Sequence, residues 1–150
     1  MKVTAGNPAT AGPDGRQTYV TKTLGTVPFG STLSFDWSWI GLDYAPFNDM
    51  SILLVGSNGV MNPSPLASIG LYGDRTGTGW NHWSQTFSGT EGFEIITIGF
   101  DVRNSRDRAF PSYLLVDNIR LEKAVPEPST VMLIFSAVGF LLARRKCKVC

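Results

Sequence analysis

The strongest structural signal in the chain is the stretch STLSFDWSWI, residues 31–40. Large apolar side chains occupy every second position of it, namely Leu33, Phe35, Trp37 and Trp39. Successive side chains of a β-strand point to opposite faces, so this spacing predicts a strand with one face buried and one face in water. Both tryptophans are therefore expected in the core.

Further strands are expected on either side of this stretch. They cover Gln17–Leu24, Met50–Val55, Ala67–Tyr72, Trp83–Ser88, Glu94–Arg103 and Ser112–Glu122. Turn-forming residues separate them, and no helical period appears before the last part of the chain. Short strands at regular spacing predict an all-β fold, an antiparallel β-sandwich. At 150 residues we expect one such domain over 1–122, then a linker over 123–130 and a distinct tail over 131–150.

The tail combines an apolar run with a basic end. Pro126 and Pro128 hold the linker extended, and a short hydrophobic helix is expected after them. Apolar side chains lie on every side of that helix, as in a core or a bilayer; they include Val131, Leu133, Phe135, Val138, Phe140 and Leu142. The basic cluster Arg144, Arg145 and Lys146 favours a membrane span with a cytoplasmic end. As a helix the apolar run would be ~20 Å long, whereas the hydrocarbon core of a bilayer is ~30 Å thick. A buried helix and a sorting segment that is later removed therefore stay as alternatives.

The order of these parts is also informative. VPEPST at residues 125–130, followed by the short hydrophobic helix and the basic end, resembles the PEP-CTERM sorting signal of exported bacterial proteins. The resemblance implies that Pro126, Glu127 and Pro128 are recognised by an exosortase, a membrane-embedded transpeptidase. It also implies a protein that is exported, anchored in the membrane through the helix, and delivered after processing to the cell surface or the exopolysaccharide matrix.

The body carries a second, weaker resemblance. SFDWSW at residues 34–39 and YLLVDNIRLE at residues 113–122 look like the β-sandwich domains found ahead of this signal. The closing stretch is also similar to the last strand of jelly-roll carbohydrate-binding modules. This likeness implies a jelly-roll-like sandwich, and it implies a structural calcium ligand at Asp117.

Charge and cysteine content narrow the function further. Residues 1–124 carry a net charge of −2 and residues 125–150 a net charge of +3, so nucleic-acid binding by the body is not expected. Both cysteines, Cys147 and Cys150, lie in the tail, where they fit half a zinc site, a lipidation site or an incidental end. Met1–Pro8 has no apolar run typical of a secretory signal peptide, so we expect an incomplete N-terminus.

Catalytic chemistry is sparse in this sequence. His82 is the single histidine, and no nucleophile motif accompanies it. The carboxylate pairs Asp43 with Asp49 and Asp101 with Asp107 would act on a glycosidic bond only if loops brought each pair together. We therefore expect no enzyme activity.

Two kinds of ligand remain open. The loop from Asp43 to Asp49 offers Asp43, Asn48 and Asp49 as oxygen ligands for a structural calcium, with Asp117 as a fourth; no other cofactor is expected. Trp80 and Trp83 border a glycine-rich loop, and exposed rings there would stack on sugars. The first hypothesis is a non-enzymatic exported protein of the surface or exopolysaccharide matrix. The alternative is a carbohydrate-binding module that holds exopolysaccharide at the cell surface.

Overall fold

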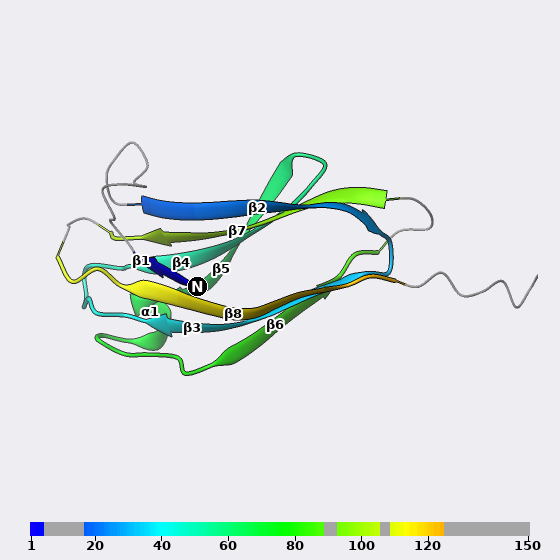
Figure 1. Ribbon diagram of the computed structural model, residues 1–150. Helices are drawn as coiled ribbons and strands as arrows, with labels where there is room; N and C mark the ends of the chain where they lie inside the picture. The colour runs from blue at the N-terminus through cyan, green and yellow to red at the C-terminus, as the bar shows by residue number, and fades with distance from the viewer. Residues whose placement is uncertain (5–16, 89–92, 106–108, 125–150) are drawn as a thin grey trace, which may run out of the picture.

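The computed structural model describes residues 1–4, 17–88, 93–105 and 109–124, which form two stacked layers of β-strands (Figure 1). In chain order, the elements are β1 (Lys2–Thr4), β2 (Gln17–Pro28), β3 (Thr32–Ile40), β4 (Met50–Ser57), β5 (Val60–Ser68), α1 (Ile69–Tyr72), β6 (Asn81–Thr86), β7 (Phe93–Arg103) and β8 (Tyr113–Glu122). The helix is one short turn, so the described fold is all-β.

The strands divide into two four-stranded sheets. One has the order β1-β8-β3-β6 and the other the order β2-β7-β4-β5, and neighbours within each sheet are antiparallel. The chain passes from one sheet to the other between successive strands, except from β4 to β5, which are neighbours in one sheet; this is the jelly-roll arrangement of two Greek keys. The predicted antiparallel β-sandwich is confirmed.

The core forms around the inward face of β3. Leu33, Phe35 and Trp39 are fully buried, and Trp37 is 7% exposed. The Phe35 ring contacts both sheets: it stacks on Trp83 of β6 at 5.0 Å and meets Phe100 of β7 edge-on at 5.1 Å. The alternation along residues 31–40 therefore predicted the buried face of β3 correctly.

One predicted strand is wrong. Residues 67–72 were expected to be extended, but the strand is β5, which ends at Ser68, and Ile69–Tyr72 form α1. The Ser68 side chain accepts a hydrogen bond from the Leu71 N–H and so caps that helical turn. The sequence pattern does not indicate most of β5, because Pro63 and Pro65 interrupt it. A strand tolerates proline at the edge of a sheet, and β5 is an edge strand.

A β-bulge in β8 decides which of its residues face the core. Asp117 lies opposite Asp36, but Arg120 lies opposite Ser34, so β8 has one extra residue at this point. Asn118 adopts a φ of 51°, a left-handed conformation that asparagine tolerates better than most residues. Before the bulge the even-numbered Leu114 and Val116 are buried, whereas after it the odd-numbered Ile119 and Leu121 line the space between the sheets.

Removing the central ring should destabilise the sandwich strongly. Phe35→Ala deletes a fully buried side chain between two aromatic neighbours, and we expect a loss of about 3–5 kcal/mol in the free energy of unfolding. Urea unfolding followed by tryptophan fluorescence measures it. The control Val60→Ala, at a position 66% exposed, should change the stability by less than about 0.5 kcal/mol. Equal effects of the two substitutions would contradict the core described here.

Candidate functional site

The main candidate site is a polar groove on the outer face of the β1-β8-β3-β6 sheet. It has a volume of about 390 Å³ and crosses three strands. Its lining consists of hydroxyl, carboxylate, amide, imidazole and guanidinium groups, from Thr32, Ser34, Asp36, His82, Ser84, Asn118, Arg120 and Glu122. These are the outward positions of strands whose other faces form the core, so the groove follows directly from the alternation.

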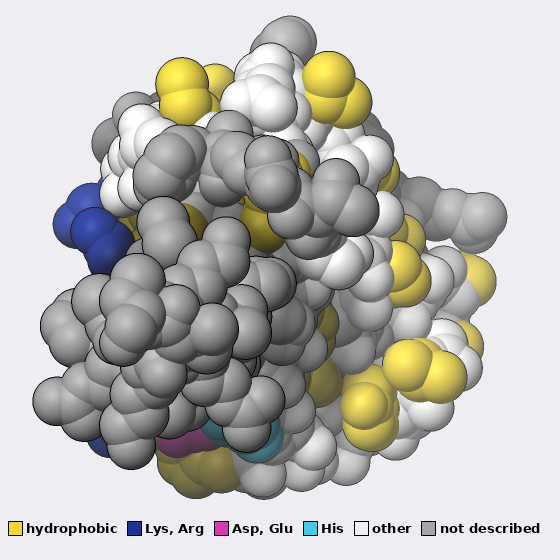
Figure 2. Space-filling model, turned by 90° about the vertical axis from the view of Figure 1, so that its right-hand side faces the viewer, with side chains coloured by type: hydrophobic (Ala, Val, Ile, Leu, Met, Phe, Trp, Pro, Cys, Tyr) yellow, Lys and Arg dark blue, Asp and Glu magenta, His cyan; other side chains and the backbone are white. Residues whose placement is uncertain are grey.

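A hydrogen-bonded network holds the centre of this groove. His82 Nδ1 donates to Asp36 Oδ1 at 2.7 Å, and Asn118 Nδ2 donates to Asp36 Oδ2 at 2.7 Å. These two bonds, the one from His82 first, lower the pKa of Asp36, so its carboxylate stays ionised. Because that carboxylate only accepts, the Nδ1 atom of His82 is the donor in this bond. Acidic side chains and the histidine indeed lie together at the lower rim of the space-filling view (Figure 2).

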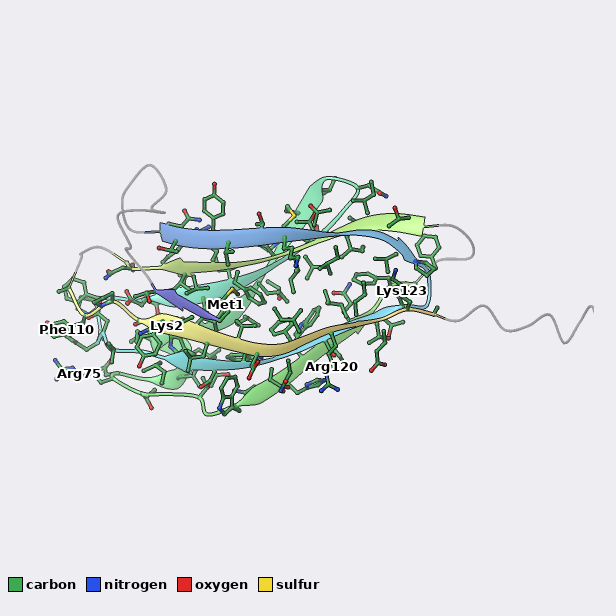
Figure 3. The ribbon with its side chains drawn as sticks, in the orientation of Figure 1. Met1, Lys2, Arg75, Phe110, Arg120 and Lys123 are labelled. Carbon is green, nitrogen blue, oxygen red and sulfur yellow. The ribbon has the colours of Figure 1, made fainter. Side chains whose placement is uncertain are left out.

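The rest of the groove supplies further hydrogen-bonding groups. The hydroxyls of Thr32 and Thr86 lie 2.9 Å apart across β3 and β6. Arg120 projects from the outer side of β8 (Figure 3). The His82 side chain is 64% exposed, so a ligand would reach it directly. This mixture of donors and acceptors, with both signs of charge, suits a ligand rich in hydroxyl groups.

The two tryptophans proposed for sugar stacking lie in different environments. Trp83 pairs with Phe35 in register and stacks on its ring, so it faces the core. Trp80 is 60% exposed just before β6 begins. The structure therefore does not bring these rings together as one platform.

The predicted calcium ligands of the 43–49 loop accept hydrogen bonds from backbone N–H groups. Asp49 is buried, and its two oxygens accept hydrogen bonds from the backbone N–H groups of Ser105 at 3.0 Å and Ser112 at 3.1 Å. Asn48 Oδ1 accepts from the Gly70 N–H at 2.7 Å. Asp43 is buried as well, and its Oδ1 accepts from the Tyr44 N–H at 2.9 Å. Asn48 and Asp49 thus join distant loops by hydrogen bonds to the backbone, whereas the Asp43 side chain bonds to the next residue in the chain.

Asp117 lies elsewhere in the sheet. It pairs in register with Asp36 in the middle of β3, whereas Asp43 follows the end of that strand. Within the described parts of the chain, no three His, Cys, Asp or Glu residues gather as a metal site. Of the other carboxylate pair, Asp101 is buried beside Arg103 at 2.7 Å, and Asp107 lies outside the described residues.

A further cluster at one end of the sandwich was not anticipated from the sequence. The Arg75 guanidinium lies over the rings of Tyr44 at 5.2 Å and Phe110 at 5.5 Å, where three loops meet (Figure 3). Arg75 and Phe110 both have positive φ, 49° and 48°. No spacing rule joins residues so distant in the chain, and only the fold brings them together. The guanidinium already occupies the ring faces, so we prefer the polar groove as the ligand site.

The decisive comparison concerns the end of the chain. Residues 124–146 match the family model of the PEP-CTERM protein-sorting motif. The motif confirms the predicted resemblance and indicates an exported protein that an exosortase sorts. A search of curated proteins gave no match.

Residues 125–150, which include all of the motif after Ala124, lie outside the described part of the chain. This applies to Pro126, Glu127 and Pro128, to the hydrophobic span and basic cluster, and to Cys147 and Cys150. Among the helices that the structure does describe, none is long and apolar enough to cross a membrane.

The buried aspartate provides a test of the calcium prediction. Asp49→Ala leaves two backbone N–H groups without their acceptor, and we expect a loss of about 3 kcal/mol in the free energy of unfolding.

Treatment with EDTA should leave the melting temperature of the wild-type chain within about 1 °C, because the backbone N–H groups already satisfy this carboxylate. A marked fall with EDTA, reversed by added Ca²⁺, would show that calcium is a structural ligand.

Proposed function

We propose that the chain is a non-enzymatic protein of the cell surface or the exopolysaccharide matrix, whose β-sandwich acts outside the cell. The observation that carries this proposal is the sorting motif at residues 124–146, directly after the last strand of a single sandwich. The order matches the logic of such a protein: the body is exported first, and the tail is then held in the membrane for processing.

The chemistry of the groove supports a role without catalysis. His82 donates to Asp36, and among the described residues no hydroxyl is its hydrogen-bond partner. A catalytic serine needs such a base within hydrogen-bonding distance. The network of Asp36, His82 and Asn118 therefore fits ligand binding better than nucleophilic catalysis.

Sorting through the tail can be tested by mass and location. The chain is expressed with a secretory signal peptide in a host that has an exosortase. We expect loss of the residues beyond the Pro-Glu-Pro motif, measured by intact mass, and recovery of the body outside the cell. Replacement of Pro126, Glu127 and Pro128 by alanine should leave a full-length chain in the membrane, whereas the control Val60→Ala should be processed normally. A full-length, membrane-bound chain in all three cases would contradict exosortase processing.

A second candidate function is the binding of exopolysaccharide in the polar groove. The supporting observation is the network of Asp36, His82 and Asn118, which presents ionised and neutral hydrogen-bonding groups on an open face. Hydrogen bonds to charged groups contribute about 1.5–3 kcal/mol each. This network is a better basis for sugar recognition than the pair of tryptophans, because Trp83 packs against Phe35.

Substitutions on the two outer faces of the sandwich would test this binding. Asp36→Ala and His82→Ala should each weaken binding to the host exopolysaccharide about tenfold or more, measured by affinity electrophoresis. The control is Thr97→Ala, which alters an exposed pair with Thr23 on the other sheet. If all three proteins bind equally, or if the wild type does not bind, the groove is not a saccharide site.

A further inference from the structure

The strand β5 turns polar side chains toward the inside of the sandwich. Among the described strands it is an edge of its sheet, and Asn62 lies opposite Val55 while Ser64 lies opposite Leu53. Leu53 is buried and Val55 packs against the core. Residues directly opposite each other share a face of the sheet, so Asn62 and Ser64 point into the space between the sheets.

The strand β6 does the same from the other sheet, of which it is an edge among the described strands. Gln85 lies opposite Leu33, which is fully buried, so Gln85 also points inward. Asn62, Ser64 and Gln85 are nevertheless exposed. Alternation predicts apolar side chains at such inward positions. Polar side chains that stay exposed there indicate that solvent or a ligand reaches between the sheets.

A hollow of about 250 Å³ lies between these two strands. Its inner part consists of apolar side chains that are buried or partly buried, namely Leu53, Val55, Trp83 and Phe87. The other side chains that carry hydrogen-bonding groups are uncharged, namely Ser57, Asn62, Ser64 and Gln85. Phe35 stacks on one face of the Trp83 ring, and the indole also lines the hollow. An apolar wall with a few hydrogen-bonding groups is the usual composition of a small-molecule site.

The lining also limits the charge of a ligand. All of it belongs to the described residues, and it contains no Asp, Glu, Lys, Arg or His. A charged ligand would lose hydration there without meeting an opposite charge, which is costly. A neutral sugar residue fits better, because its C–H groups pack against apolar walls while its hydroxyl groups bond to amides. The volume is below the ~300–1,000 Å³ of sites for drug-sized ligands, so it suits one sugar ring rather than a longer segment.

We propose that this hollow binds a single uncharged sugar residue of a polysaccharide, packed against Trp83 and hydrogen-bonded by Asn62 and Gln85. The inference rests on the proposed saccharide ligand, but it adds a site that is distinct from the polar groove. His82 and Ser84 of β6 line the polar groove on the outer face. Trp83 and Gln85 of the same strand line the hollow on the inner face. Each site can therefore be altered without changing the side chains of the other.

Binding to defined oligosaccharides tests the proposal. The full chain, in a detergent without sugar groups, is applied to an array of neutral, uronic-acid and amino-sugar oligosaccharides. We expect binding to neutral members of the array. Asn62→Ala and Gln85→Ala should each weaken this binding about threefold to tenfold, because each removes a hydrogen bond. Both side chains are exposed, so the melting temperature should stay within about 2 °C of the wild-type value.

A matched pair of larger substitutions separates the hollow from the polar groove. Ser64→Phe fills the hollow and should weaken binding of the neutral oligosaccharides about tenfold or more. Ser84→Phe makes the same change in the polar groove, on the outer face of β6, and should leave this binding unchanged. Loss of binding in Ser84→Phe alone would overturn the hollow and leave the polar groove as the saccharide site.

Three other results would overturn the proposal. They are a wild-type chain that binds no neutral oligosaccharide, a preference for charged oligosaccharides, and unchanged binding by both Asn62→Ala and Gln85→Ala. The alanine variants also decide the case in which both phenylalanine variants lose binding. None of these results bears on sorting through the tail, which intact mass and location test separately.

Discussion

The structure depends on the packing of β3 against the opposite sheet, with Phe35 between Trp83 and Phe100. This ring contacts both layers, so it marks the face of β3 that is buried. Since the side-chain period of a strand is two, fixing Phe35 inward fixes Asp36 outward. The core and the candidate binding groove are therefore two consequences of one alternation.

The groove also requires an interruption of that alternation. The bulge in β8 lets Leu114 and Val116 fill the core on one side of Asn118 and turns Ile119 and Leu121 toward the space between the sheets on the other. It also lets the Asn118 amide reach Asp36, which a regular strand would not guarantee. A local departure from regular pairing thus completes a network that involves three strands.

The sorting motif and the β-sandwich body depend on different features of the sequence. The sorting motif at 124–146 is a linear signal, so its information lies in residue order and composition. The polar groove of the body, in contrast, is lined by strands that are distant in the chain. The groove and the motif meet at β8, which is a central strand of its sheet, supplies Asn118 and Arg120 to the groove, and leads directly into the motif.

The sequence alone determined the sorting motif, the all-β class and the buried face of β3. The motif is a linear order of residues, and the strands follow from the two-residue alternation of apolar side chains. It also indicated most strands, but not β1 or β5, since one is very short and the other contains Pro63 and Pro65. Only the tertiary structure decided that Trp83 lies inside, that Asp49 binds backbone N–H groups, and that Asp36 meets His82. These outcomes depend on contacts between residues up to 63 positions apart, which the spacing along one strand does not encode.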